Sequence, residues 1–191
     1  MATVLILDVG VKCANAKGEL NHAFAKLAQD ELSSRGFAVH ITRVGEPYVV
    51  ADEVAYLKGA DFVIVQTPGF WMGPPWQLKR YFDEVLTGNG FNDGDGRHRA
   101  HPEMKYGSGG LMQGKHFMLC STWNAPLCAF ENKDEFFEGA GIDGLFMPLR
   151  KTFEFIGMQQ LPSFMVNDIY KNPQIAQDME RFKAHLQQYI G

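Results

Sequence analysis

Residues Gln66 to Leu86 read Q-T-P-G-F-W-M-G-P-P-W-Q-L-K-R-Y-F-D-E-V-L, and this stretch decides the class of fold. The apolar run Phe62 to Val65 just before it predicts a buried strand, and Trp76 to Leu86 predicts an amphipathic helix. The loop between them leaves the carboxyl end of a strand, which is where open α/β sheets bind ligands. Because this loop is rich in aromatic residues and stiffened by glycine and proline, it predicts a site for a planar cofactor or substrate.

Strand-like and helical segments alternate along the rest of the chain. The first helix is the clearest, because apolar side chains between Leu20 and Leu32 share one face and Gly36 follows as a C-cap. The predicted strands are Thr3–Leu7, Ala38–Val44, Phe62–Val65, His116–Ser121 and Ser163–Val166, and the other predicted helices are Val49–Lys58, Trp76–Leu86, Leu145–Ile156 and Pro173–Ile190. This alternation predicts an α/β fold in which residues 1–191 form a single domain, with a doubly wound, five-stranded parallel sheet and helices on both faces.

Two segments depart from the alternation. Residues Gly88–Gly114 form a long excursion rich in Gly, Asp, Arg and His, and long ordered loops usually have a function. Within it, Tyr106 precedes a glycine-rich run and is interpreted either as an aromatic hydroxyl presented to a ligand or as an anchor of the loop. The charged cluster Glu131–Glu138 is expected to be a solvated helix face.

Composition excludes several classes of function. With a formal net charge of −4 and a pI near 5.8, the chain has no electrostatic basis for binding nucleic acid or an anionic membrane. Cys13, Cys120 and Cys128 are odd in number and lack C-x-x-C spacing, which predicts unpaired thiols in a reducing compartment. No apolar run reaches the length of a signal peptide or a transmembrane helix, so we expect a cytoplasmic protein with no integral membrane segment.

Several catalytic motifs are also absent. The loop Asp8–Gly18 lacks the G-x-G-x-x-G of dinucleotide-binding domains. The run Gly109–Lys115 comes close to a nucleotide-binding P-loop, but His116 replaces the required Ser or Thr and the run precedes a strand. The spacing of His98, His101 and His116 matches no metal site, and no G-x-S-x-G nucleophile is present. We therefore expect no metal, no NTPase activity and no hydrolase activity.

The loop after the first strand is a candidate phosphate site. It precedes a helix whose free N–H groups favour anions. Lys12, Asn15, Lys17 and Asn21 are candidate contacts to a diphosphate, and the alternative for each is an ordinary surface polar residue.

The loop after the fourth strand, S-T-W-N-A-P at residues 121–126, is a second candidate. Thr122 and Asn124 have groups that hydrogen-bond a heterocycle, and Trp123 is expected to pack alongside it unless it is a core residue. Because parallel strands end at one edge of a sheet, this loop and the loop Pro68–Met72 are expected to converge there.

Five stretches give the chain a specific resemblance: PGFWMGPPWQLKRY at residues 68–81, DGRHR at 95–99, KYGSGGLMQGK at 105–115, TWNAP at 122–126 and GIDG at 141–144. With them the whole chain resembles the modulator of drug activity B family of bacterial NADPH:quinone reductases, which are flavodoxin-like proteins. The resemblance implies a homodimer that binds FAD at the subunit interface, takes hydride from NADPH and passes two electrons to a quinone in ping-pong fashion.

The resemblance also implies the site residues. The flavin contacts are Ala16, Lys17, Gly18, Glu19, Leu20 and Asn21 before the first helix, Pro68, Gly69, Phe70, Trp71 and Met72 after the third strand, Tyr106 in the excursion, and Thr122, Trp123, Asn124 and Ala125 after the fourth strand. We expect Phe70 and Trp71 to wall the flavin and backbone N–H groups near Gly69 and Asn124 to meet its polar edge. Tyr106 is expected to act as a lid or as a proton donor to the quinone.

Two other functions remain compatible with the sequence. One is a flavin-binding ancillary subunit that regulates a transporter, and the other is an electron carrier that uses FMN. A dimer is further expected because Phe130, Phe136, Phe137 and Phe146 would be many exposed aromatic residues for one small domain.

Overall fold

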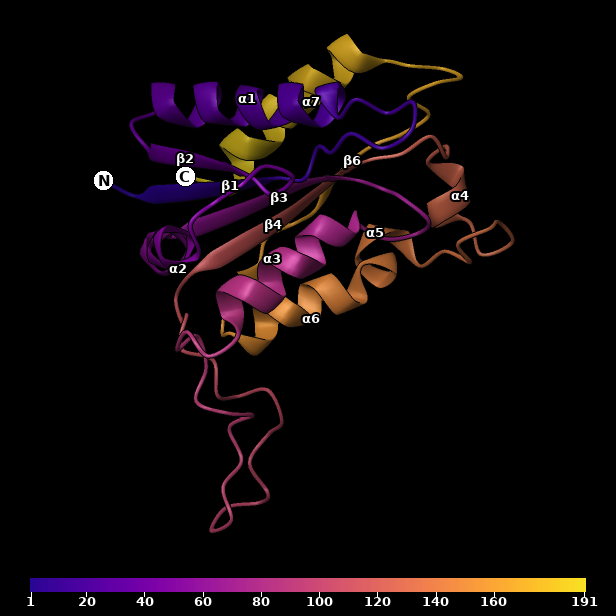
Figure 1. Cartoon of the computed structure of the whole chain (residues 1–191). Coiled ribbons are helices and arrows are strands. Elements are labelled where there is room, and N and C mark those ends of the chain that lie inside the picture. The colour runs from indigo at the N-terminus through magenta and orange to yellow at the C-terminus, as the bar shows by residue number, and fades with distance from the viewer.

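A parallel sheet lies between two layers of helices in the computed structural model, which describes residues 1–191 (Figure 1). Its strands are β1 (Thr3–Asp8), β2 (Ala38–Arg43), β3 (Phe62–Pro68), β4 (His116–Thr122), β5 (Gln159–Gln160) and β6 (Phe164–Val166). The order across the sheet is β2-β1-β3-β4-β5, and β6 also pairs with β4. All pairs are parallel, so the predicted doubly wound α/β sheet is confirmed.

Helices cover both faces of the sheet, as expected (Figure 1). α1 (Glu19–Ser34) and α7 (Ile175–Tyr189) lie on one face, and α2 (Val50–Gly59), α3 (Trp76–Leu86) and α6 (Met147–Phe155) lie on the other. Two short helices, α4 (Cys128–Glu131) and α5 (Gly141–Leu145), follow β4. None of the helices combines the length and the hydrophobicity that a membrane span requires.

The central strands are buried on both faces because their side chains alternate between two hydrophobic clusters. Along β1, Leu5 and Leu7 join the cluster under α2, α3 and α6, whereas Val4 and Ile6 join the cluster under α1 and α7. This two-sided burial explains why the strands read as continuous apolar runs in the sequence.

The end of α1 matches the sequence prediction. Gly36 has a φ of 88°, its N–H donates to the carbonyl of Ser33, and the N–H of Phe37 donates to the carbonyl of Leu32. These two bonds form a Schellman motif, which needs a left-handed residue at this position.

The predicted fifth strand, Ser163–Val166, is present as β6, and the structure adds the short strand β5, which was not predicted. β5 and β6 are separated by Leu161, Pro162 and Ser163. Because Pro162 has no N–H group, it cannot donate to β4 and the ladder breaks there.

Three helix predictions were wrong in detail. The cluster Glu131–Glu138 is mostly turns rather than a helix face. The helix predicted over Leu145–Ile156 is α6, which begins two residues later, at Met147, because Leu145 ends α5 and Pro148 has no N–H with which to continue that helix. Pro173 lies outside α7, whose N-cap is Gln174.

The long excursion leaves α3 and returns to the start of β4, so it lies at the amino end of that strand. In Figure 1 it extends as an arm away from the sheet. Short bridges tie its two sides together, between Asn92 and Gly110 and between His98 and His101. The arm therefore leaves from the side of the sheet opposite to the predicted binding edge.

Candidate functional site

Loops at the carboxyl edge of the sheet surround a cavity of about 320 Å³. They are the β1–α1 loop, the β3–α3 loop, the segment after β4 and the segment after β6. The cavity lining includes these predicted site residues: Ala16, Lys17, Gly18, Glu19, Leu20, Asn21, Pro68, Gly69, Phe70, Thr122 and Asn124. The candidate phosphate contact Asn15 also lines it, together with Val11, Ile169 and Tyr170, which the sequence did not indicate. No local motif marks the last two, because they follow the short strand β6.

The β1–α1 loop is tightly folded on itself. A Cβ added at Gly10 would lie 2.7 Å from the Gly18 carbonyl oxygen, and a Cβ added at Gly18 would lie 2.8 Å from the Gly10 carbonyl carbon. The Asp8 carboxylate fixes the loop by accepting from the N–H of Gly10 over 2.9 Å and by pairing with His22 Nδ1 over 2.6 Å. Only glycine fits at these two contacts, so the loop keeps one shape.

The amino end of α1 offers free hydrogen-bond donors. The N-cap, Gly18, has a φ of 80° and no side chain with which to cap the helix. The N–H groups of Glu19, Leu20 and Asn21 donate to no acceptor in the chain. Because these residues line the cavity and a helix amino terminus favours negative charge, this wall suits a phosphate.

The β3–α3 loop contains a strained turn. The N–H of Phe70 donates to the Gly73 carbonyl over 2.7 Å, and the Gly73 N–H donates back over 3.0 Å. Between them Trp71 and Met72 have φ values of 48° and 64°. Positive φ at both central residues is the pattern of a type I′ turn, which usually contains Asn and Gly. Strain of this kind in bulky residues gathers at functional sites.

Trp123 lies in the core rather than in the cavity. Its indole N–H donates to Ser121 Oγ over 2.8 Å, and its ring packs against Phe130, Phe137 and Phe146. A Cβ at Gly69 would come within 2.2 Å of this ring. Trp123 therefore supports the β3–α3 loop from below. Of the two roles considered for it in the sequence, the structure shows that of a core residue.

Two other buried polar residues support the cavity wall. Asn21 donates to Thr122 Oγ1 over 3.1 Å and accepts from Gln66 Nε2 over 2.9 Å. Both Asn21 and Thr122 are buried, yet both line the cavity. Of the backbone donors expected at the polar edge, the Gly69 N–H is occupied by the Thr122 carbonyl, whereas the Asn124 N–H has no acceptor in the chain.

Several predicted site residues do not line this cavity. The Trp71 side chain is 97% exposed, and Met72 lines a separate apolar groove beside α3 and α6. The Ala125 carbonyl accepts from the Asp168 N–H and from Asn167 Nδ2, both over 3.2 Å. Tyr106 lies on the arm, where its ring packs beside Phe155 and under Arg97. Within a single chain, these residues therefore lie outside the cavity lining.

The exposed aromatic residues differ from those expected. Phe130 and Phe146 are buried and Phe137 is partly buried, because all three pack around Trp123. Of the four phenylalanines named above, only Phe136 is exposed. The large exposed aromatic rings are Tyr56, Trp71, Trp76, Tyr106, Phe136 and Tyr170.

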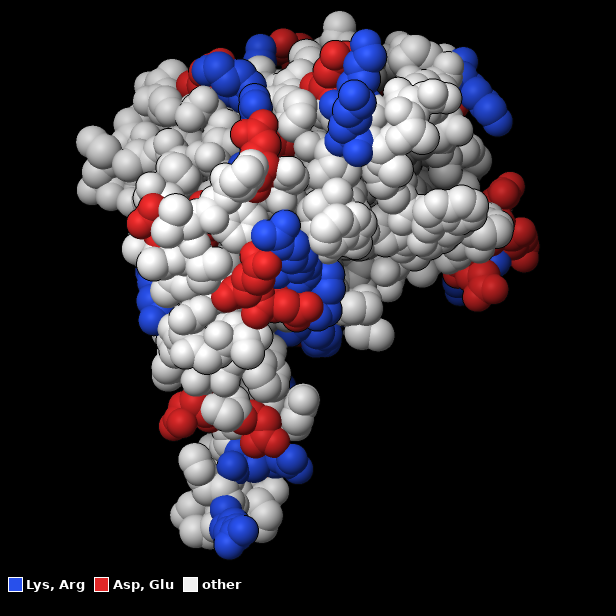
Figure 2. Space-filling model, in the orientation of Figure 1, with Lys and Arg blue, Asp and Glu red and all other residues white.

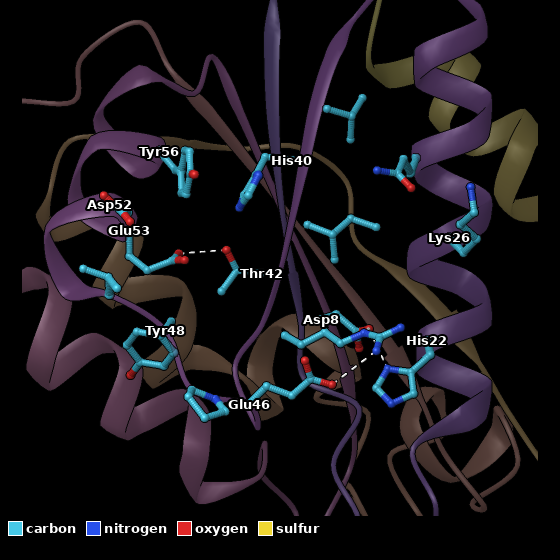
Figure 3. Close-up of a pocket in the computed structure, with 16 residues that line it drawn as sticks. Asp8, His22, Lys26, His40, Thr42, Glu46, Tyr48, Asp52, Glu53 and Tyr56 are labelled. Carbon is cyan, nitrogen blue, oxygen red and sulfur yellow. Dashed lines mark hydrogen bonds and ion pairs between the residues drawn. The ribbon is translucent and has the colours of Figure 1, made fainter.

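A larger groove, of about 690 Å³, follows the edge strand β2 between α1 and α2 (Figure 3). Several of its polar groups are paired with one another. Arg43 contacts Glu46 over 3.2 Å, and the Thr42 hydroxyl donates to Glu53 over 2.8 Å. No predicted flavin contact lines this groove, so the smaller cavity at the carboxyl edge is the candidate site.

Charge does not mark a binding surface on the face drawn in Figure 2. Basic and acidic side chains alternate along it, and no continuous basic patch appears.

Burial raises the pKa of the Cys120 thiol, so this cysteine stays neutral. No cluster of three or more His, Cys, Asp or Glu residues suits a metal ion.

Comparison with known proteins agrees with this architecture. A family model described as flavodoxin-like fold matches residues 2–190. NADPH:quinone oxidoreductase MdaB of Haemophilus influenzae is 44% identical over 190 residues, which cover 98% of this chain and 99% of the relative. The protein therefore belongs to the flavodoxin-like fold family, and the family resemblance found in its motifs is confirmed.

Solved structures share the fold at lower identity. A candidate quinone reductase from Klebsiella pneumoniae superposes with a TM-score of 0.78 at 20% identity, over 98% of this chain and 84% of that one. General stress protein 14 of Treponema denticola, solved in complex with FMN, has a TM-score of 0.64 at 19% identity, over 98% of this chain and 99% of that one.

Proposed function

We propose that the protein is a flavin-dependent NADPH:quinone oxidoreductase that reduces quinones to hydroquinones. The observation that carries the proposal is that the free N–H groups of α1 and the loops after β3 and β4 border the same cavity. An anion-binding helix terminus beside an apolar wall is what a phosphorylated heterocycle needs. The name of the 44% identical relative supports NADPH as the donor and a quinone as the acceptor.

Each wall of the cavity has its own task in this proposal. The N–H groups of Glu19 and Leu20 hold a phosphate, Phe70 contacts the ring, and the N–H of Asn124 meets the polar edge of the ring. A bound flavin supplies the redox chemistry, because it accepts a hydride and passes on two electrons. The chain then needs no acid/base pair, and its residues serve to bind and orient.

We infer that the flavin is FAD. Asn15 and Lys17 add polar contacts to the helix terminus, which is more than one phosphate requires, and the exposed ring of Tyr170 at the same cavity can stack on an adenine. FMN is the alternative that the Treponema complex favours. Chromatography of the flavin released from the purified protein distinguishes the two, and FMN alone would contradict the inference.

The assembly proposed here is a homodimer. Trp71 and Trp76 expose large apolar surfaces next to the groove between α3 and α6, which is more than a monomer usually leaves uncovered. Tyr106, which lies away from the cavity of its own chain, is then supplied to the site by the second copy. Light scattering at micromolar concentration tests this, and a monomer would contradict it.

The decisive test combines binding and kinetics. Apoprotein is titrated with FAD, and the loaded protein is assayed for NADPH and NADH oxidation with several quinones. If donor and acceptor use the site in turn, initial rates at several quinone concentrations give parallel lines. Failure to bind any flavin would refute the proposal, and intersecting lines would refute the shared site.

Lys17 provides a test of the phosphate wall. Lys17→Ala is expected to weaken FAD binding about fivefold, the scale of an exposed charge-assisted hydrogen bond. Added salt should weaken the wild type more than the variant, because screening removes an attraction that only the wild type has. The matched control is Lys12→Ala, since Lys12 is exposed in the same loop but does not line the cavity. Equal losses for the two variants would mean that Lys17 makes no specific contact.

A further inference from the structure

Three buried polar side chains form a chain of hydrogen bonds at the cavity wall. Gln66 Nε2 donates to Asn21 Oδ1 over 2.9 Å, and Asn21 Nδ2 donates to Thr122 Oγ1 over 3.1 Å. Their exposed fractions are only 1% for Gln66, 4% for Asn21 and 2% for Thr122. Asn21 and Thr122 line the cavity, whereas Gln66 does not. Gln66 is thus the residue of this hydrogen-bonded series that lies farthest from a bound ligand.

The direction of these hydrogen bonds decides what Thr122 offers to the cavity. A hydroxyl group has one hydrogen and two lone pairs. Because Asn21 Nδ2 donates to Oγ1 over 3.1 Å, the Thr122 hydrogen has within the chain only a long contact to Asn21 Oδ1, over 3.4 Å, and can donate to a ligand instead. With the Asn21 amide reversed, Oδ1 would take the place of Nδ2 at 3.1 Å, Thr122 would donate to it, and only lone pairs would remain for a ligand.

Gln66 favours the first direction. In the first direction, Gln66 Oε1 is buried and has no hydrogen-bond partner. Reversing the hydrogen bonds requires the Gln66 amide to turn, so that Oε1 accepts from Asn21 and the Gln66 NH₂ group loses its only acceptor. Buried N–H groups without acceptors are rarer than buried carbonyl oxygens without donors. The unpartnered Oε1 is therefore the lesser cost.

We propose that Gln66 is a positioning residue that acts through Asn21 and Thr122 to keep the Thr122 hydroxyl a hydrogen-bond donor to a bound flavin. This inference rests on the proposed function and extends it to a residue outside the cavity lining. A flavin presents phosphate oxygens and ring carbonyls as acceptors and gains negative charge when reduced. A hydroxyl hydrogen attracts such groups, and hydroxyl lone pairs repel them.

Thr122 is tested first, with flavin affinity measured by fluorescence titration of apoprotein. Thr122→Val removes the hydroxyl at nearly constant size and is expected to weaken flavin binding about tenfold, the effect of one hydrogen bond. Thr122→Ser keeps the hydroxyl and should remain within about threefold of wild type. Equal affinities of the Val and Ser variants would overturn the proposal.

A double-mutant cycle then tests whether Gln66 acts through Thr122. Gln66→Met is expected to weaken flavin binding about threefold in the wild-type background, because the Asn21 amide is no longer held in one direction. In the Thr122→Val background the same change should have no effect, since no hydroxyl remains to be oriented. Equal weakening in both backgrounds would overturn the role of Gln66.

Gln66→Glu serves as the conservative rescue. Burial keeps an unpaired carboxyl group neutral, and a neutral carboxyl donates one hydrogen as the amide does. Flavin affinity of this variant is expected to match wild type at about pH 5, where the carboxyl is protonated. A loss as large as that of Gln66→Met at this pH would contradict the proposal.

Thermal unfolding of each apoprotein separates effects on folding from effects on binding. If wild-type protein binds no flavin, the proposed function itself fails. If it binds flavin and the cycle is additive, only the positioning role fails. The Thr122 pair keeps the test decisive even if a Gln66 variant does not fold.

Discussion

Glu53 and Gln66 are both buried polar residues in or beside the sheet. A side-chain oxygen of Glu53 has two hydrogen-bond partners, whereas the side-chain oxygen of Gln66 has none. Glu53 Oε2 accepts from the hydroxyls of Thr42 over 2.8 Å and Tyr81 over 3.0 Å (Figure 3 draws the first). Burial raises the pKa of Tyr81 and the nearby Glu53 raises it further, so that hydroxyl stays protonated and remains a donor. Gln66 Oε1, in contrast, is buried without any partner.

The difference follows position in the fold. Glu53 lies on α2 and bonds Thr42 near the end of the edge strand β2, whereas Gln66 lies near the end of the central strand β3 beside the cavity. Backbone strain has the same distribution, because every non-glycine residue with positive φ lies in a segment that follows β1, β3, β4 or β6: Ala14, Trp71, Met72, Glu138 and Asp168. Of the buried polar atoms without a partner, Gln66 Oε1 and Asp168 Oδ1 lie in or after strands that end at this edge, whereas Gln77 Oε1 and Arg150 Nε belong to α3 and α6. Strained turns are thus gathered in the segments that leave the carboxyl edge, as expected of a functional edge.

The largest expected effect contrasts the two networks directly. Glu53→Met should lower the free energy of unfolding by about 3 kcal/mol, because two buried hydroxyls lose a charged acceptor. The matched change Gln66→Met should cost less than about 1 kcal/mol, since it removes one hydrogen bond together with an unpartnered oxygen. Urea denaturation of the apoproteins measures both free energies of unfolding. Equal losses would mean that the Glu53 and Gln66 networks contribute equally to stability.

Next in size is the contact that supports the edge from below. Gly69→Ala places a Cβ against the Trp123 ring, which is held by Ser121 and by packed phenylalanines. We expect a loss of about 2 kcal/mol in stability, the usual cost of overpacking, together with loss of flavin binding. Gly73→Ala is the control in the same loop, because its Cβ would meet nothing within 4 Å. A Gly69→Ala protein with normal stability and flavin affinity would show that Trp123 can yield.

The smallest expected effect tests the strained turn. Met72→Gly should raise the free energy of unfolding by roughly 0.5–1 kcal/mol, since glycine adopts positive φ without steric cost. The opposite change, Gly36→Ala, should lower it by about 1 kcal/mol although the space around Gly36 is empty. If Met72→Gly is destabilising, the apolar contacts of Met72 with the α3–α6 groove outweigh the strain.

Local patterns predicted much of the fold because local chemistry controls it. The apolar runs of β1, β3 and β4, the amphipathic face of α1 and the stop at Gly36 depend on residues within a few positions of one another. The break between β5 and β6 has an equally local cause in Pro162, and β5 was not predicted because two residues are too short to produce a pattern. The excursion was predicted as irregular. Its direction away from the sheet was not predicted, because nothing in its sequence specifies the direction in which it extends.

The sequence by itself determined which loops meet at the carboxyl edge, since parallel strands must end together once the order of strands and helices is set. Only the tertiary structure decided what each residue does there. Asn21 and Thr122 are 101 positions apart, and Asn21 and Gln66 are 45 apart. They bond because α1 packs across the ends of β3 and β4, where Gln66 pairs with Cys120 and Thr122 lies two residues further on, on the same face. The same packing placed Trp123 in the core and Tyr106 on the arm. Such contacts depend on the whole sheet being assembled, and no short stretch of sequence contains that information.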